Sequence, residues 1–286
     1  MPSWDYMLED RRCAVGEKLI RPSQGWVPIN FSAVWQRRSL LYFLTLRDLK
    51  VRYKQTLLGA IWVALQPLLV MVVFSTVFGV LAKMPSEGLP YPVYYFCALV
   101  PWQLVANAFG DAGVSLVSNQ NLITRVYFPR LIVPLSAVLA RLVDFVFCLI
   151  VLLVILIYYR IPIENTIYSL PIFILLALAA GLGVGLWLAA LNVRYRDVRQ
   201  MTPFITQLWF FVSPIAYSAS LIPERWRFFY GLNPMVGIID GFRWALLRKG
   251  SGINESLLLS VTIIVVVLVG GLYYFRRTER DIADVV

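Results

Sequence analysis

Charged residues divide the chain into long apolar stretches, and these stretches predict helices that cross a membrane. A charge at the centre of a bilayer costs about 3 kcal/mol on insertion scales, so uncharged intervals mark candidate spans. A spanning helix needs about 20 residues, and each interval meets that length. Five intervals contain no charged residue, namely 55–82, 88–110, 165–193, 200–223 and 256–275.

A sixth apolar stretch, 131–159, is equally long but contains Arg141 and Asp144. These residues are three positions apart, so they can meet on one helix face and reduce each other's desolvation cost. We interpret them first as a structural pair near the cytoplasmic end of the span; a contact to substrate phosphates or a proton relay is the alternative.

The pattern therefore predicts an all-α integral membrane protein with six transmembrane helices. Their expected bounds are about 58–82, 91–114, 131–159, 166–191, 200–219 and 254–275. Six spans put both termini on one side, and the side richer in Lys and Arg is the cytoplasm. The tails and connections on the side of the two termini hold 18 basic residues, and the connections on the opposite side hold seven. Both termini, including the 276–286 tail, are thus predicted to be cytoplasmic.

Residues 35–57 are predicted to form an amphipathic helix that leads into the first span. At 100° per residue its aromatic and leucine side chains fall within about 60° of one another, away from the charged residues. The members of this stripe are Trp35, Tyr42, Leu46, Leu49 and Tyr53. Such a helix lies in the headgroup layer with its basic residues pointing away from the lipid. A passive anchor and a docking role for a partner both stay open.

The connections between spans differ in character. Residues 115–130 predict a short cytoplasmic helix, and the basic loop 192–200 serves in its simplest interpretation to hold topology. The connection 221–253 is rich in aromatic residues and is broken at Asn233-Pro234, which no single helix tolerates well. It predicts two short helices that dip into the membrane and cap a path. Aromatic belting at the interface is the competing explanation.

Composition limits the classes of function that the chain can have. The 286 residues are 59% hydrophobic and 15% charged, with a mean hydropathy of +0.72, which a soluble domain does not need. Histidine is absent, which excludes the usual serine triads and the commonest zinc ligands. Three separated cysteines without a CxxC motif predict no metal site. The net charge of +10 is attributed to the topology and to anionic lipid, not to nucleic acid.

Two further sequence observations concern helix packing and nucleotide binding. Gly181 and Gly185 form a small-xxx-small pair that lets two helices approach closely. No GxxxxGK[ST] motif occurs, so the chain does not hold a nucleotide in a P-loop. If transport is active, the ATPase is therefore another polypeptide.

Several segments together resemble the membrane permeases of ABC-type polysaccharide exporters, which export O-antigen, capsule and teichoic acid. They are LRDLKVRYKQTLLGAIWVALQPL (46–68), LPYPVYYFCALVPWQ (89–103), NLITRVYFPRLIVPL (121–135), LNVRYRDVRQ (191–200), LNPMVGIIDGFRWALL (232–247) and FRRTERDIADVV (275–286). The blocks follow the family order and the likeness runs from about residue 35 to the end. The polar segment 1–34 falls outside it, and it shows no cleavable signal peptide.

This resemblance implies a homodimer of six-span subunits in a bacterial inner membrane, working with two copies of a separate ATP-binding subunit. That partner would bind ATP and Mg, while this chain would carry no cofactor and would not be an enzyme. The cargo would be a polysaccharide linked to polyprenyl diphosphate, with O-antigen as the first candidate. An ABC exporter of another lipid or drug, a proton-coupled secondary transporter and a membrane-embedded glycan enzyme are the alternatives. The last two should show internal repeats or clustered carboxylates, and neither pattern is found.

The resemblance also assigns roles to particular residues. Contact with the ATPase is expected at Arg47, Asp48, Lys50, Arg52, Arg196 and Asp197. The cytoplasmic gate, where arginine suits a diphosphate headgroup, is expected at Arg125, Tyr127 and Arg130. The periplasmic gate is expected at Trp226, Asn233, Pro234 and Trp244.

Aromatic rings suit a sliding sugar polymer, because they pack on its C–H faces without fixing its register. Aromatic residues make up 14% of the chain. The channel is therefore expected to be lined by Trp62, Phe74, Tyr94, Trp102, Trp209, Phe210 and Tyr217.

Overall fold

The computed structural model describes residues 31–54, 60–162, 164–195, 197–249 and 255–279. Within these ranges every regular element is a helix. In chain order the elements are α2 (Phe31–Gln36), α3 (Arg38–Tyr53), α4 (Ala60–Phe74), the π-helical η1 (Ser75–Leu81), α5 (Tyr91–Ser118), α6 (Gln120–Arg125), α7 (Ile132–Tyr158), η2 (Asn165–Ser169), α8 (Leu170–Arg194), α9 (Val198–Val212), η3 (Ala219–Leu221), α10 (Glu224–Gly231), α11 (Pro234–Leu247) and α12 (Glu255–Thr278).

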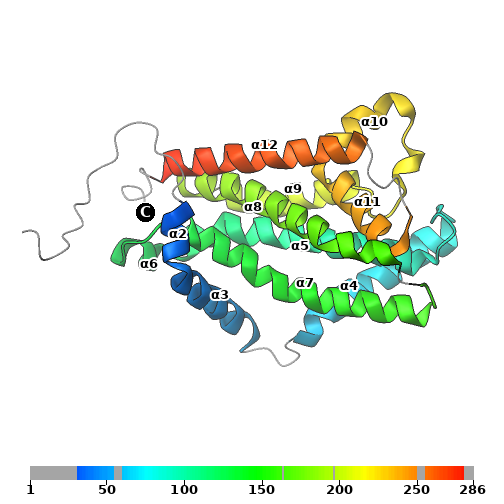
Figure 1. Ribbon diagram of the computed structural model, residues 1–286, viewed down its shortest axis with the longest axis horizontal. Coiled ribbons are helices and arrows are strands. Elements are labelled where there is room, and N and C mark those ends of the chain that lie inside the picture. Colours follow the sequence, from blue (N-terminus) through cyan, green and yellow to red (C-terminus); the bar gives the residue numbers. More distant parts are fainter. Residues whose placement is uncertain (1–30, 55–59, 163, 196, 250–254, 280–286) are drawn as a thin grey trace, which may run out of the picture.

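The long helices α5, α7, α8 and α12 run side by side along the long axis of the molecule (Figure 1). Helices α2, α3 and α6 lie at one end of this bundle, and α10 and α11 lie toward the other (Figure 1). The end of α12 lies at the same end as α2, where the Arg130 side chain donates to the backbone oxygen of Glu279. The described N-terminal and C-terminal helices therefore share one end of the bundle.

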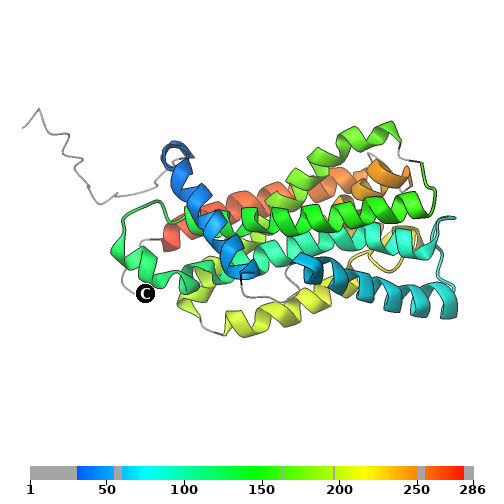
Figure 2. The same ribbon diagram turned by 90° about the horizontal axis from the view of Figure 1, so that it is seen from below.

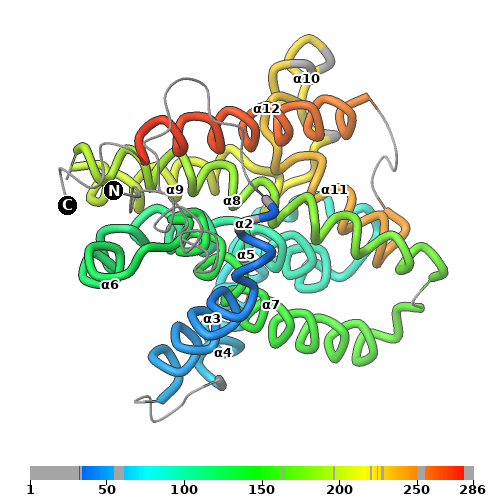
Figure 3. The backbone as a smooth tube through the Cα atoms, turned by 60° about the vertical axis from the view of Figure 1, so that its left-hand side comes forward, coloured from blue at the N-terminus to red at the C-terminus, as the bar shows by residue number. Residues whose placement is uncertain are grey.

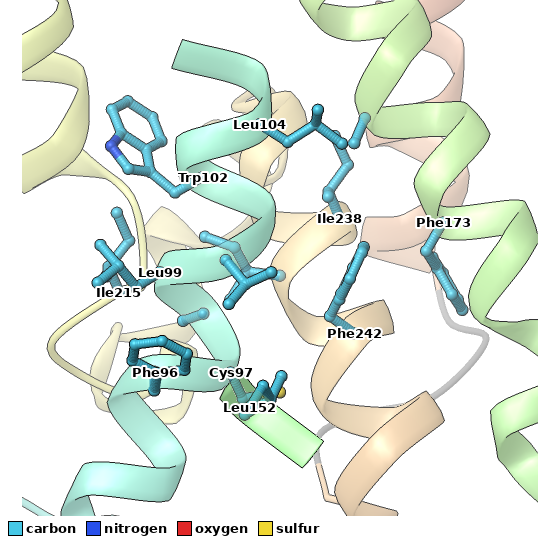
Figure 4. Packing of buried hydrophobic residues seen from close by; sticks show 14 of the residues in the cluster. Phe96, Cys97, Leu99, Trp102, Leu104, Leu152, Phe173, Ile215, Ile238 and Phe242 are labelled. Carbon is cyan, nitrogen blue, oxygen red and sulfur yellow. The ribbon is translucent and has the colours of Figure 1, made fainter. Parts of the chain in front are cut away.

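Helix α5 forms the centre of the packing because its side chains are buried on more than one face. Leu104 points toward Ile238 and Phe242 of α11, whereas Trp102 points to another side of α5 (Figure 4). All four side chains are buried. The first helical turn of α5 contains a proline, which suits a position whose N–H has no intrahelical partner.

Close contact between α5 and α8 depends on glycine. A Cβ on Gly185 would lie 2.6 Å from the Cβ of Ala112, and one on Gly181 would lie 2.8 Å from the Cβ of Ala108. Such distances are too short for carbon atoms, so neither position accepts a side chain unless the helices separate. The small-xxx-small interpretation is confirmed, and its partner helix is α5.

Four helical segments are long and apolar enough to cross a membrane: Ile61–Leu81, Ile132–Tyr158, Asn165–Arg194 and Glu255–Thr278. They match four of the six expected spans, so the chain is a membrane protein. The expected span 91–114 corresponds to α5, which has 28 residues but is not among these four. Within the expected span 200–219 the helix α9 has only 15 residues and ends at Val212.

The early end of α9 has a local cause. A residue that precedes proline is pushed toward extended backbone by the proline ring, and Ser213 precedes Pro214. Ser213 accordingly has φ −91° and ψ 149°. At 1.5 Å per residue α9 is about 22 Å long, shorter than the roughly 30 Å of a bilayer core. Apolar composition alone did not reveal this break.

The expected single helix 35–57 is two helices. The chain breaks at Arg37, which has φ −104° and ψ 28°, so Trp35 lies in α2 and the rest of the stripe lies in α3. Leu44 is buried against the bundle, whereas Tyr42 is exposed. The orientation of the charged residues also differs from the expectation. Asp48 and Arg52 face other helices, because they find ionic or hydrogen-bonding partners there.

The two helices expected within 221–253 are present as α10 and α11, on either side of the Asn233-Pro234 break. The Asn233 side chain accepts a hydrogen bond from Met235 N at 3.0 Å and so caps α11. Pro234 takes the first helical position. Most of α11 is buried, and it packs against α5, α8 and α12. The short helix expected within 115–130 is α6.

Candidate functional site

Two arginines and two aspartates from three helices form a closed ionic network. Arg141 of α7 holds Asp111 of α5 with two nitrogens, Nε to Oδ2 at 2.6 Å and Nη2 to Oδ1 at 2.8 Å. Its Nη1 also donates to Asp144 Oδ2 at 2.9 Å. Arg52 of α3 donates to Asp144 Oδ2 at 2.8 Å and to Asp111 Oδ2 at 2.7 Å. The Arg141–Asp144 pair is therefore present, as one part of a larger network.

Tyr53 adds a fifth group to the network, because its hydroxyl donates to Asp144 Oδ1. Burial, and then the hydrogen bond to Asp144, raise the pKa of the Tyr53 hydroxyl, so it stays protonated and acts as the donor. Arg52 and Tyr53 both belong to the end of α3. The network thus attaches this end of α3 to α5 and α7.

A cleft of about 720 Å³ lies next to the network, between the end of α3, α4, α5 and α7. Figure 3 shows α3 and α4 together on one side of the molecule. The charged part of the lining is Arg52, Arg141 and Asp144. The remaining walls carry two indoles, Trp62 and Trp102, and three side-chain amides, Gln66, Gln103 and Asn107. The volume is typical of a ligand site, which is mostly apolar with a few convergent polar groups.

The expected channel residues separate into three groups. Trp62 and Trp102 line the cleft. Phe74, Trp209 and Phe210 pack with Trp102 in one aromatic cluster. Phe74 and Phe210 have ring centroids 5.7 Å apart, and Trp102 and Trp209 are also 5.7 Å apart at an angle of 90°. In the conformation described, this cluster holds α4, α5 and α9 together.

The other two expected channel residues lie near α11. Tyr94 has no exposed surface in this conformation, and the Arg243 guanidinium lies 3.7 Å from its ring centroid, so its place in the channel stays a prediction. The Tyr217 hydroxyl accepts from Tyr230 at 3.2 Å and lies 3.1 Å from the Val212 carbonyl oxygen. Tyr217 therefore connects the irregular segment that follows α9 to the last residue of α9 and to Tyr230.

The expected periplasmic gate residues are divided between α10, which contains Trp226, and α11 with its N-cap, which contain Asn233, Pro234 and Trp244. Asn233 accepts from Trp209 Nε1 at 2.8 Å and donates to Ser213 Oγ at 3.1 Å, so it ties α11 to the end of α9. Pro234 and Trp244 are half-buried, whereas Trp226 of α10 is exposed. The four residues lie on two helices and do not form one cluster.

The expected cytoplasmic gate residues lie around α6. Arg125 and Tyr127 are exposed. Arg130 is half-buried and occupied, since its guanidinium donates to Glu279 and its backbone N–H lies 3.4 Å from Glu279 Oε1. The Tyr127 carbonyl accepts from Arg37 Nη1 at 2.8 Å. Contacts from Arg37, between α2 and α3, and from Glu279, directly after α12, thus converge on this segment.

The residues expected to contact an ATPase are divided between α3 and the 192–200 connection. Arg47 bonds Asp48 at 2.8 Å and Asn119 Oδ1 at 2.6 Å, and Lys50 is exposed. Arg52 faces the ionic network described above. Asp197 is exposed, and Arg196 lies outside the described residues.

Two charged residues that contact other segments of the chain, the half-buried Asp111 and the buried Arg243, were not singled out from the sequence. Asp111 is an ion-pair partner of both network arginines, and its position as the first charge after the interval 88–110 could have identified it. Arg243 is 1% exposed and its Nη2 donates to the Ile215 carbonyl at 3.2 Å. Asp240, three positions earlier, is its nearest acid at 3.9 Å. In the part of the chain that the structure describes, no group of His, Cys, Asp or Glu could hold a metal ion.

Comparison with known proteins places the chain among transporters. A family model described as ABC-2 type transporter matches residues 39–247. The O-antigen export system permease protein RfbA of Myxococcus xanthus is 29% identical over 255 residues, covering 88% of this chain and 96% of that protein. The RfbA protein of Klebsiella pneumoniae is 27% identical over 86% of this chain and 94% of its own length. The polysialic acid transport protein KpsM of Escherichia coli is 21% identical over 83% and 92%.

Proposed function

The chain belongs to the ABC-2 type transporter family, and we propose that it is the permease of an ATP-driven exporter that moves lipid-linked polysaccharide, O-antigen first, out of the cytoplasm. The observation that carries the proposal is the likeness to O-antigen export permeases over nearly the full length of both chains. The aromatic and amide-lined cleft is consistent with a sugar cargo. In this proposal the chain itself is the transport subunit.

We propose that α5 and α9 complete six crossings with the four apolar helices. Helix α5 is long enough, and the non-helical segment 213–218 extends the path of α9 toward η3. Six crossings agree with the shared location of α2 and the end of α12 (Figure 1). The excess of Lys and Arg on that side supports cytoplasmic termini in a bacterial inner membrane.

A homodimer would cover apolar surface that the single chain leaves open. Only 6% of the most apolar window of Ile61–Leu81 is buried, the least of the four spans. Helix α9 exposes Phe204, Leu208 and Phe211. Helices α4 and α9 lie along the same lower edge in Figure 2. A second copy on this edge would also enclose the aromatic residues, and α10 and α11 would close the path at its far end.

The end of the bundle with α2, α3 and α6 is the expected contact for two copies of an ATPase subunit, which would bind ATP and Mg. Because α3 is ion-paired to α5 and α7, a displacement of α3 by the ATPase would also displace α5 and α7, which form walls of the cleft. Exposed Arg125 lies at this end, where a polyprenyl diphosphate headgroup would enter.

The proposed function is tested by expressing the chain with a candidate ATPase and purifying the complex in lipid. We expect the two proteins to co-purify and ATP hydrolysis to rise when lipid-linked polysaccharide is added. The matched control is the same ATPase without this chain. Transport by this chain alone, with no ATPase present, would overturn the proposal.

Trp62 and Trp209 are expected to respond differently to alanine. Trp62 is 51% exposed and faces the cleft, so Trp62→Ala should slow polysaccharide export several-fold without changing thermal stability. Trp209 is packed and hydrogen-bonded, so Trp209→Ala should also lower the free energy of unfolding by about 3 kcal/mol.

Export by proteoliposomes and thermal unfolding in detergent measure these two effects. Leu175→Ala is the control for Trp62, because Leu175 is exposed on α8, a helix outside the cleft lining and outside the edge proposed for the second copy. Unchanged export in the Trp62 variant would remove this residue from the path.

A further inference from the structure

The cleft beside the ionic network presents side-chain amides on helices that are otherwise apolar. Gln66 belongs to α4, and Gln103 and Asn107 belong to α5. Gln66 and Asn107 are exposed, and within the described part of the chain neither side chain has a hydrogen-bond partner. An amide that faces hydrocarbon without a partner costs several kcal/mol. These amides therefore require a polar environment, and each can both donate to and accept from a hydroxyl group.

The two arginines in the cleft wall are balanced by two carboxylates, of which Asp144 lines the cleft and Asp111 does not. Arg52 and Arg141 together carry two positive charges, and Asp111 and Asp144 carry two negative charges. Both guanidinium groups contact both carboxylates at 2.6–2.9 Å. A phosphate or a carboxylate in the cleft would have to displace an existing partner, so the wall offers no surplus positive charge to an anion.

The two indoles complete the lining. Trp62 exposes half of its surface, and the ring of Trp102 is held edge-on against Trp209. Aromatic faces pack on the C–H faces of sugar rings, while amides bond the hydroxyls at the ring edges. Neither type of contact requires charge on the ligand.

We propose that this cleft binds uncharged sugar residues of the exported polymer, and that it excludes both acidic sugars and the diphosphate head of the lipid carrier. The inference rests on the proposed function, since it names the part of the cargo that this site takes. Gln66, Gln103 and Asn107 supply the hydrogen bonds, and Trp62 and Trp102 supply the stacking surface.

The test is equilibrium dialysis of the full-length chain, with its ATPase partner, in lipid nanodiscs. The probes are maltohexaose as an uncharged oligosaccharide, a sialic acid hexamer as an acidic one, and inorganic pyrophosphate. We expect maltohexaose to bind at least about tenfold more tightly than either anion. Its binding should not change between low and high salt, because no charge is paired on binding.

Variants then locate the site. Gln66→Ala/Asn107→Ala should weaken maltohexaose binding about tenfold, since each lost hydrogen bond contributes a modest net free energy. Asn165→Ala is the matched control, because Asn165 is an exposed amide in η2 outside the cleft. Asp144→Asn should raise binding of the sialic acid hexamer, because it leaves one positive charge uncompensated.

Equal or tighter binding of an anionic probe to the unaltered protein would overturn the inference, and so would unchanged maltohexaose binding in the double amide variant. Neither comparison depends on the folding of the Asp144 variant. If polysaccharide still stimulates ATP hydrolysis while maltohexaose does not bind, this inference fails and the proposed function stands. If stimulation itself is absent, the proposed function fails.

Discussion

Replacing Arg141 with alanine is expected to lower the free energy of unfolding by about 3 kcal/mol, because it leaves Asp111 and Asp144 with only Arg52 between them. Removing one partner of a buried ion pair costs about 3–5 kcal/mol. The lower end applies here, since the Arg141 side chain is 19% exposed. Thermal or denaturant unfolding of the purified chain in detergent measures the change.

Two controls separate charge balance from the loss of a side chain. Arg248→Ala removes an arginine from an exposed pair with Glu164 at 3.4 Å, and it should cost less than about 1 kcal/mol. Arg141→Ala/Asp144→Ala removes one charge of each sign and leaves Arg52 with Asp111. The double variant should be less destabilised than the sum of its single variants. A simple sum would show that the network does not act as a unit.

Replacing Gly185 with leucine is expected to prevent normal packing of α8 on α5. The new Cβ would lie 2.6 Å from the Cβ of Ala112 and 3.3 Å from the Cα of Phe109, and the latter belongs to the backbone. Overpacking costs about 1–3 kcal/mol when a core can adjust. Two rigid helices cannot, so we expect a loss of about 3 kcal/mol or more, seen as aggregation on size-exclusion chromatography and a lower unfolding temperature.

Gly110→Leu is the matched control, because Gly110 lies on α5 and a Cβ there would meet nothing within 4 Å. The same glycine-to-leucine change should then have little effect on folding, since leucine also favours helix more than glycine does. Similar losses for the two variants would contradict the role assigned to the α5–α8 contact.

Much of the helix order could be predicted, because the relevant signals lie within a few residues of one another. The Asn233-Pro234 break and the Gly181/Gly185 spacing are local patterns, and each has the structural role expected of it. The end of α9 was missed although Ser213-Pro214 marks it, since the span was drawn from the absence of charge. The break at Arg37 has no glycine or proline to signal it.

The candidate site was less predictable, because its residues come together only in three dimensions. Arg141 and Asp144 are neighbours on one helix and could be paired from their spacing. Arg52 lies 59 residues from Asp111 and 92 from Asp144, so no local pattern connects them. Arg243 could have been noticed by the same three-residue spacing from Asp240, but its burial depends on α11 packing against α5, where it lies on the ring of Tyr94.

The wide separation of the network residues along the chain sets an order for assembly. A polypeptide leaves the ribosome from its N-terminus, so Arg52 and Tyr53 enter the membrane surface before Asp111 and Asp144 have been synthesised. Arg52 therefore lacks both carboxylates until α5 brings Asp111, and it lacks Asp144 until α7 is inserted. Between its own synthesis and the insertion of α7, the amphipathic α3 therefore stays at the lipid surface. It docks onto the bundle after α7 is inserted.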